Sequence, residues 1–260
     1  MLEERIDDRP FLRLIKKWLK AGILEPGGEV IHPVTGTPQG GIVSPILANV
    51  YLHYGLDLWF HKVVKKYCRG EACLIRYADD FVCAFQYQKD AERFYGALGK
   101  RMGKFRLGLS AEKTRVMRFS RDHQRGKASF DFLGFEFRWG KDRGGRPHLK
   151  RRTSRKKLRR SLRNFTDWCK ANRHLRLDLL FRKLNAKLRG YYNYYGVIGN
   201  YASLMQFFKQ ALRILFKWLN RCSQRISYNW RGFQELIELF NIERPRIVGR
   251  PKMRRAVSTA

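Results

Sequence analysis

The sequence predicts an α+β fold, in which a region of antiparallel strands and helices precedes an all-helical region. Two runs of strand-forming residues, 74–77 and 81–85, flank a short acidic turn and predict a β-hairpin. From residue 158 onward, leucine and aromatic residues recur at the spacing of amphipathic helices. Between these regions, residues 138–150 are rich in Gly, Arg and Lys, which indicates a change of domain. A chain of 260 residues can bury a sizeable core in one or two domains.

The formal net charge of +33 is the most extreme feature of the composition. Self-repulsion on this scale destabilises a compact state unless a polyanion is the usual partner. Because aromatic residues are interleaved with the Lys and Arg, RNA or DNA is favoured over a membrane surface. No apolar run approaches the roughly 18 residues of a membrane span, and the N-terminus has no signal-peptide pattern.

The five cysteines are scattered and never spaced as Cys-x-x-Cys. This pattern indicates free thiols in a reducing compartment, such as the bacterial cytoplasm, and no zinc site. The residues concerned are Cys68, Cys73, Cys83, Cys169 and Cys222.

The first predicted element is a helix over residues 11–21, which Gly22 ends. Residues 25–35 then predict a short hairpin with Gly27-Gly28 as its turn and Val30-Ile31 as strand. The helix is expected to turn inward the apolar residues Phe11, Leu12, Leu14, Ile15, Trp18 and Leu19.

A longer helix is predicted from Ser44 to about Lys66, since Ser44 can act as N-cap and Pro45 suits the first helical position. Its free N–H groups follow Gly40-Gly41, which permits close backbone approach, so a phosphate or nucleotide sugar could bind there. Taken alone, two glycines before a capped helix are more often only a loop. The expected inward residues are Ile46, Leu47, Val50, Tyr51, Tyr54, Leu58 and Val63.

The acidic turn of the hairpin presents Asp79 and Asp80 side by side. Adjacent carboxylates repel each other, so the pair gains most from Mg²⁺, which prefers oxygen ligands. An Asp-Asp dipeptide is by itself more often an ordinary solvated turn.

After the hairpin, the pattern predicts a helix over 90–105, a strand over 115–119 and a further strand over 130–137. The last strand alternates cleanly except at Gly134, which suggests a bulge or a close backbone contact.

The C-terminal region begins with a basic run: nine of the fourteen residues 150–163 are Lys or Arg. Helical patterns follow over 158–169, 177–188, 204–219 and 233–240, and we interpret their apolar faces as a bundle core. Between them, residues 189–195 hold four tyrosines beside Arg189, which could stack on bases or pack against helices.

Taken in order, these motifs resemble those of bacterial group II intron-encoded proteins, which are reverse transcriptases and maturases. The resemblance covers nearly the whole chain. Residues 77–80 resemble the polymerase motif with two metal-binding aspartates, and residues 38–45 the template- and nucleotide-contacting loop with its helix. Residues 108–114 are similar to the next palm motif, and residues 132–135 to the primer-grip hairpin.

The resemblance implies a partial polymerase palm over residues 1–138, a basic linker over 139–157, a helical thumb/maturase domain over 158–241 and a basic, disordered tail over 242–260. It implies that Asp79 and Asp80 are catalytic and hold Mg²⁺, and that Leu133 and Gly134 form the primer grip. The residues implied to bind nucleotide or template are Pro38, Gln39, Gly40, Gly41, Tyr77 and Lys113. Those implied to bind RNA are Lys150, Arg151, Arg152, Arg155, Lys156, Lys157, Arg159, Arg160, Arg189, Tyr191 and Tyr192.

In the implied two-metal reaction, one ion activates the primer 3′-hydroxyl and both stabilise the displacement at the α-phosphate. Lys113 could offset developing phosphate charge or donate a proton to the pyrophosphate. The partners implied are group II intron RNA, an RNA template with a DNA primer, deoxynucleoside triphosphates and, in addition, target DNA.

The family also carries a third catalytic aspartate in a strand upstream of the first helix. The acids available here, Glu3, Glu4, Asp7 and Asp8, lie in a strandless opening and match helix-start positions better. We therefore expect a chain truncated at its N-terminus, with very low polymerase activity alone. The alternatives are a non-catalytic RNA-binding splicing factor and a reverse transcriptase of retron or defence type.

Overall fold

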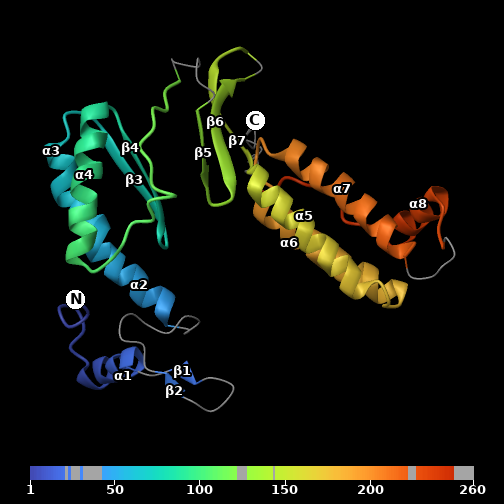
Figure 1. Cartoon of the computed structure of the whole chain (residues 1–260), viewed down its shortest axis with the longest axis horizontal. Coiled ribbons are helices and arrows are strands. Elements are labelled where there is room, and N and C mark those ends of the chain that lie inside the picture. Colours follow the sequence, from blue (N-terminus) through green and yellow to red (C-terminus); the bar gives the residue numbers. More distant parts are fainter. Residues whose placement is uncertain are drawn as a thin grey trace, which may run out of the picture. The chain divides into compact units, whose positions relative to one another are not determined.

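The computed structural model describes residues 1–20, 23–24, 30–31, 43–121, 128–142, 144–221 and 227–248. The chain divides into two compact units, Met1–Arg118 and Phe119–Ala260 (Figure 1). Helices and antiparallel strands occur together, which confirms the predicted α+β class.

The first unit opens with α1 (Arg9–Lys20), which confirms the first predicted helix. The carboxylate of Asp8 caps it by accepting a hydrogen bond from the Phe11 N–H at 2.9 Å. The predicted inward face is wrong for most of its members, because only Ile15 is buried, whereas the Trp18 side chain is 42% exposed. Strands β1 (Ile23–Leu24) and β2 (Val30–Ile31) pair antiparallel, so the predicted strand is present. The predicted Gly27-Gly28 turn lies outside the described residues.

The predicted long helix is present as one continuous helical segment of mixed geometry. It comprises α2 (Ser44–Leu52), the π-helical segments η1 (His53–Asp57) and η2 (Phe60–Val64), and α3 (Lys65–Tyr67). Its N-cap is Val43, so Ser44 is the first helical residue and not the cap that the sequence predicted.

The inward face of this segment also differs from the prediction. Ile46 is 63% exposed, whereas Leu56 and Phe60 are fully buried. A π-turn takes up more residues than an α-turn, so the residues that follow it lie on a different face from the one that α-helical spacing predicts. Leu56 and Phe60 were not predicted as core residues, because the prediction rested on α-helical spacing throughout.

The acidic hairpin is formed by β3 (Ala72–Tyr77) and β4 (Asp80–Phe85), as predicted. The hairpin is followed by α4 (Gln88–Lys104), which confirms the next predicted helix. The two strands, α4 and the π-helical segments share one hydrophobic core, in which Trp59 and Phe85 pack near Phe94. The buried members of this core are Leu56, Phe60, Phe94, Leu98 and Met102.

The predicted strand over 115–119 is wrong. Residues 114–120 have no strand assignment, and a segment with strand-forming side chains forms a strand only where another strand completes its hydrogen bonds. In the part of the chain that the structure describes, no strand pairs with them.

The second unit begins with a three-stranded antiparallel sheet of β5 (Ser129–Phe132), β6 (Phe135–Lys141) and β7 (Pro147–Thr153). The single strand predicted over 130–137 is a hairpin, not a bulged strand. Leu133 and Gly134 form its two-residue turn, with φ of 49° and 79°. Positive φ at both positions is typical of a type I′ turn.

The two compact units do not coincide with the segments expected from the sequence and do not test the expected palm, linker and thumb domains. Part of the expected linker, residues 147–153, forms β7, and the first unit ends at Arg118 instead of residue 138. β7 was not predicted because residues 147–151 are exposed and include basic residues, so no alternation of buried and exposed positions marks the strand; Thr153 is buried at its end.

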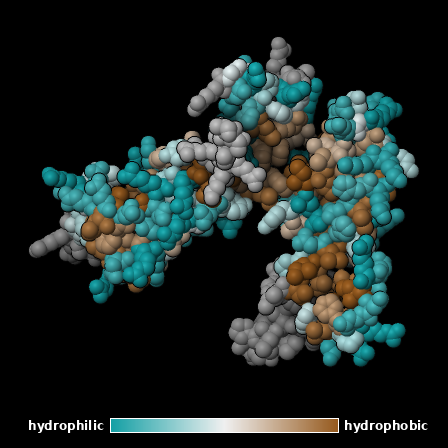
Figure 2. Space-filling model, turned by 180° about the vertical axis from the view of Figure 1, so that it is seen from behind, coloured by the Kyte–Doolittle hydropathy of each residue, from teal (hydrophilic) through white to brown (hydrophobic). Residues whose placement is uncertain are grey.

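The four predicted C-terminal helices are confirmed as α5 (Arg155–Asn172), α6 (Leu177–Tyr195), α7 (Tyr201–Leu219) and α8 (Trp230–Leu239). Their leucine and aromatic residues form the larger core. Figure 2 shows hydrophobic surface over the three-stranded sheet and mainly hydrophilic surface over the helices of this unit.

Residues 242–248 do not form a separate tail. Ile242 is buried in the helical core, and the Val248 N–H donates to the Gly196 carbonyl at 2.7 Å. The remainder of the expected disordered tail, residues 249–260, lies outside the described residues.

Cys68, Cys73, Cys83 and Cys169 are free thiols, as predicted, and burial raises the pKa of Cys169 to about 12. Cys222 also lies outside the described residues.

Candidate functional site

The candidate site is the turn between β3 and β4. Tyr77 pairs with Asp80 at the end of the ladder, so Ala78 and Asp79 form a two-residue turn. The φ of Ala78 is 51°, in the left-handed region. Asp79 and Asp80 are both exposed, and Tyr77 is 67% exposed. The predicted presentation of two neighbouring carboxylates at a hairpin turn is therefore present.

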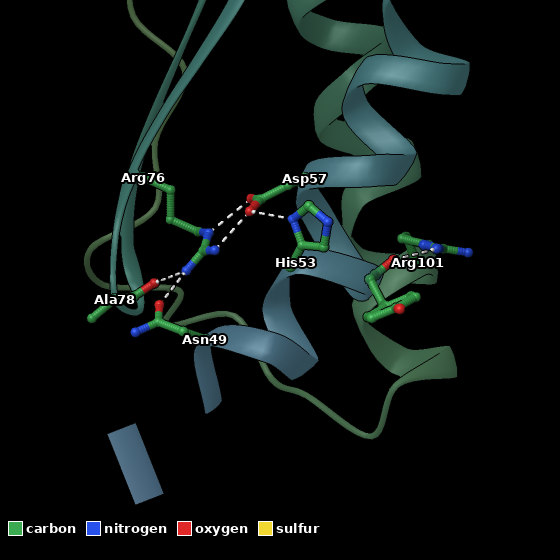
Figure 3. Close-up of polar contacts among 7 residues, drawn as sticks. Asn49, His53, Asp57, Arg76, Ala78 and Arg101 are labelled. Atoms are coloured by element: carbon green, nitrogen blue, oxygen red, sulfur yellow. Dashed lines mark hydrogen bonds and ion pairs between the residues drawn. The ribbon is translucent and has the colours of Figure 1, made fainter. Parts of the chain in front are cut away.

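The guanidinium of Arg76 ties this turn to the helical segment behind it (Figure 3). Its Nη1 donates to the Ala78 carbonyl oxygen at 2.8 Å and to Asn49 Oδ1 at 2.8 Å. Its Nε and Nη2 donate to the two carboxylate oxygens of Asp57 at 2.8 and 2.6 Å. Such a bidentate pair fixes the guanidinium plane as well as its position.

The electrostatics of the pair follow from its partial burial. Burial of Asp57 works to raise its pKa, but the hydrogen bond and charge of Arg76 lower the pKa below its ordinary value. His53 Nδ1 lies 3.4 Å from Asp57 Oδ2 and acts in the same direction. The same hydrogen bond raises the pKa of Arg76, so the ion pair stays charged at neutral pH.

Asn49, Asp57 and Arg76 were not selected from the sequence. A signal for Arg76 was present: it shares the strand face of Ala72 and Leu74, both of which pack on the hydrophobic core. A charged residue at a core-facing position of a hairpin requires a partner of opposite charge, which here is the part-buried Asp57.

The residue types at the turn fit a divalent cation. Two adjacent exposed carboxylates supply the oxygen ligands that Mg²⁺ prefers. Within the described ranges, no group of three or more Asp, Glu, His or Cys side chains could hold a metal ion. Asp79 and Asp80 therefore offer two carboxylates at this turn, and no third Asp, Glu, His or Cys side chain completes a metal-binding group with them among these residues.

The predicted nucleotide-binding residues are only partly described. Pro38, Gln39, Gly40 and Gly41 lie outside the described residues. Lys113 is exposed and lies in a turn, in which the Ser110 carbonyl accepts hydrogen bonds from the N–H groups of Lys113 and Thr114 at 3.1 and 2.9 Å.

The turn of the β5–β6 hairpin is held by its neighbours in the second unit. The Ser154 N–H donates to the Gly134 carbonyl at 2.9 Å. A Cβ added at Gly134 would lie 3.1 Å from the Tyr195 hydroxyl, which confirms the predicted close approach at this glycine.

Most of the predicted RNA-binding cations are exposed on β7 and α5. Two of the others take part in ion pairs: Arg152 binds both carboxylate oxygens of Glu136 at 2.9 Å, and Arg189 lies 3.0 Å from Glu243. The exposed residues on these two elements are Lys150, Arg151, Arg155, Lys156, Lys157, Arg159 and Arg160, and Arg189 on α6 is exposed as well.

The assignment of Tyr191 and Tyr192 to RNA contact is wrong. Tyr192 is fully buried, and the ring of Tyr191 stacks on Phe207 with centroids 3.8 Å apart. Both side chains belong to the core between α6 and its neighbours, which was the other interpretation that the sequence allowed. Tyr194, at 54% exposure, is the tyrosine of this motif that reaches the surface.

A strongly basic chain with two carboxylates at a rigid hairpin turn is typical of a protein that acts on nucleic acid. The chain belongs to the reverse transcriptase (RNA-dependent DNA polymerase) family, because the profile of that family matches residues 3–137, just over half of the sequence.

Similarity to individual proteins is strongest over short segments. Over 53 residues, 20% of this chain, it is 51% identical to an uncharacterized 91 kDa protein in a cob intron of Schizosaccharomyces pombe. Over an equal length and share, it is 49% identical to group II intron-encoded protein LtrA of Lactococcus lactis subsp. cremoris. A match of 29% identity to the putative COX1/OXI3 intron 2 protein of Saccharomyces cerevisiae covers 129 residues, 50% of this chain.

These matches cover only 6%, 9% and 13% of the respective relatives, so the chain spans a small part of their length. Of the helices described, none combines the length and the hydrophobicity that crossing a bilayer requires.

Proposed function

We propose that this chain is the part of a group II intron-encoded reverse transcriptase and maturase that carries the metal-binding hairpin and an RNA-binding helical region. The observation that carries the proposal is the exposed Asp79-Asp80 pair, held at a braced turn within the segment that matches the reverse transcriptase family. The names of two relatives, an intron-encoded protein and an intron protein, support the same context.

In this proposal, Asp79 and Asp80 would hold Mg²⁺ through their carboxylate oxygens. When bound, the metal would supply activation of the primer hydroxyl and stabilisation of phosphate charge. The side chains themselves repel each other without a cation, so the turn that holds them adjacent favours metal binding. Lys113, which is exposed, would offset negative charge on the nucleotide phosphates.

The remaining contacts are assigned by the resemblance. Pro38, Gln39, Gly40, Gly41 and Tyr77 would border the template and the incoming nucleotide. Leu133 and Gly134, in the β5–β6 turn, would contact the primer. The first unit would then be a partial palm, and the helices of the second unit a thumb and maturase domain.

Intron RNA would bind the exposed cations of β7 and α5. Phosphate contacts of this kind release counterions, so the affinity would fall steeply with salt. Target DNA could use the same electrostatic attraction.

Primer extension tests the enzymatic part of the proposal. The full chain is incubated with an RNA template, a DNA primer, deoxynucleotides and Mg²⁺, and compared with the D79N/D80N variant. Glu71→Gln is the matched control, because Glu71 is an exposed acid at the opposite end of the same hairpin. Mg²⁺-dependent cDNA that is lost only in D79N/D80N supports the proposal, whereas cDNA synthesis that survives the double substitution contradicts it.

A non-catalytic RNA-binding splicing factor is the second candidate. It is favoured by the location of the exposed cations, which lie in the unit that does not contain the aspartates. This candidate predicts salt-sensitive binding of intron RNA that D79N/D80N leaves unchanged, together with no cDNA from any variant.

A further inference from the structure

We propose that Arg76 is the positioning residue for Asp79 and Asp80: its guanidinium fixes the turn from which both metal-binding carboxylates project. The inference rests on the proposed function, because it assumes that the two aspartates hold a divalent cation. It adds a residue that the polymerase motif of residues 77–80 does not include.

The backbone of the turn needs external support. Ala78 has a φ of 51°, a conformation that residues with a Cβ seldom adopt and that glycine or asparagine would tolerate better. The turn consists only of Ala78 and Asp79, so the hairpin supplies no further residues to distribute the strain. A contact that holds Ala78 in this conformation therefore determines the shape of the turn.

Arg76 makes that contact. Its Nη1 donates to the Ala78 carbonyl at 2.8 Å. This carbonyl and the N–H of Asp79 belong to one planar peptide group. Fixing the direction of the carbonyl therefore fixes the plane from which the Asp79 backbone continues, and with it the direction of the Asp79 side chain.

The other end of the guanidinium is anchored to the helix. Asp57 in η1 accepts two hydrogen bonds, and Asn49 in α2 accepts one more (Figure 3). Only 13% of the Arg76 side chain and 21% of the Asp57 side chain are exposed, so solvent screens the pair weakly. The turn is thus braced against the helical segment and does not depend on the hairpin alone.

The charge of Arg76 is already compensated by Asp57, which argues for a geometric role. A lysine keeps the charge but has a single ammonium in place of the planar fork, so it cannot reproduce the four hydrogen bonds in one plane. Neutralising repulsion between the two aspartates would require only a charge. Bracing the Ala78 carbonyl requires the fork.

The test uses the full chain and Mn²⁺ as the probe, with free Mn²⁺ measured by electron paramagnetic resonance. The D79N/D80N variant defines binding that does not involve the turn. R76Q removes both the planar guanidinium and its charge, whereas R76K removes the planar guanidinium and keeps a positive charge. A second readout is millisecond hydrogen–deuterium exchange of the peptide that spans Ala78 and Asp79.

Arg101→Gln is the matched control. Arg101 is also part-buried and also braces η1: its Nε and Nη2 donate to the Gly55 and Tyr54 carbonyls at 2.9 and 3.1 Å. It makes none of these bonds to the hairpin turn, so its loss disturbs the same helix without releasing Ala78.

We expect R76Q and R76K to weaken the aspartate-dependent Mn²⁺ affinity about tenfold, the scale found for residues that orient metal ligands. Both should accelerate exchange in the turn, whereas R101Q should leave affinity and turn exchange unchanged. An affinity in R76K equal to that of the native chain would overturn the positioning role, as would equal losses in R76Q and R101Q. If the native chain and D79N/D80N bind Mn²⁺ with equal affinity, the proposed metal site is wrong. In that case hydrogen exchange still tests the contact between Arg76 and Ala78: unchanged exchange of the turn in R76K would show that Arg76 does not hold the turn in place.

Discussion

Tyr194 donates its phenolic O–H to the main-chain carbonyl of Leu133 at 2.9 Å, and so joins the last turn of α6 to the tip of the β5–β6 hairpin. Its ring also stacks on Phe135, with the centroids 6.0 Å apart. The hairpin that the family resemblance assigns to the primer is thus held by a helix that follows it by some sixty residues in sequence. The residue is half exposed, so the hydroxyl can be removed without opening the core.

Tyr194→Phe should loosen this turn while keeping the ring. We expect faster hydrogen exchange across Leu133 and Gly134 and a fall of about 1 kcal/mol in the free energy of unfolding, the net value of one hydrogen bond. Chemical denaturation and exchange mass spectrometry measure both effects. Tyr201→Phe, at a 48% exposed position on α7, is the control and should change neither. Equal exchange in the two variants would contradict the role of the Tyr194 hydroxyl.

Gly134→Ala should destabilise the second unit. The φ of Gly134 is 79°, and an added Cβ would lie 3.1 Å from the Tyr195 hydroxyl, so strain and crowding act together. We expect a loss of about 1–2 kcal/mol in the free energy of unfolding. Gly190→Ala in α6 is the matched control, because nothing lies within 4 Å of its Cβ position. A helical glycine replaced by alanine should instead stabilise by about 0.5–1 kcal/mol. A loss of stability in both variants would refute the explanation from backbone conformation.

The Glu136–Arg152 pair should make stability depend on acid pH. The hydrogen bond from Arg152 lowers the pKa of Glu136 below its ordinary value of 4.5, although burial opposes this shift. A carboxyl group with a lowered pKa in the folded state stabilises the fold above its ordinary pKa, and that contribution is lost as pH falls below it. The free energy of unfolding of the native chain should therefore exceed that of Arg152→Gln at pH 7, and the difference should shrink below pH 4.5.

Denaturation of both proteins at a series of pH values between about 7 and 3 measures this difference. Arg138→Gln is a suitable control, because Arg138 is exposed on the same strand as Glu136 and lowers the pKa of Glu136 less than Arg152 does. A difference between native and R152Q proteins that stays constant through the acid range would show that the pair is not its source.

Removing positive charge from α5 should weaken RNA binding and reduce its salt dependence. Replacing Arg155, Lys156 and Arg159 by Gln should lower the slope of log affinity against log salt by about one unit for each RNA phosphate that these side chains neutralise. Filter binding of intron RNA at several salt concentrations measures the slope. The triple Gln variant of Lys89, Lys100 and Lys104, all exposed on α4, removes the same charge elsewhere. Equal slopes for the two triple variants would assign the effect to net charge alone.

The sequence predicted those parts of the fold where local pattern and packing agree. The leucine stripe of α6 and the strand runs on either side of Asp79 were sufficient, because each element buries the face that its period defines. β7 was missed because Lys150 and Arg151, which lie on opposite faces of the strand, are both exposed and are typical of a linker, although β6 supplies the hydrogen bonds of a strand.

The candidate site was predicted less completely than the fold. The aspartates follow directly from the sequence, since they sit between two strand runs. Their support does not, because the partners of Arg76 come from positions 19 and 27 residues away and depend on packing. The break in alternation at Gly134 indicated a bulge or a close contact, and only the family resemblance indicated a hairpin, because a bulge and a type I′ turn both interrupt the alternation of a strand.

The π-helical segment η1 has a consequence for insertions and deletions. Asn49, His53 and Asp57 occur at intervals of four residues, and two of them reach one guanidinium, Arg76. Excising a single residue between Asn49 and Asp57 would rewind the segment and rotate Asp57 by about 100° relative to Asn49. The hairpin would keep its sequence, but Arg76 could no longer bind Asp57 and Asn49 at the same time.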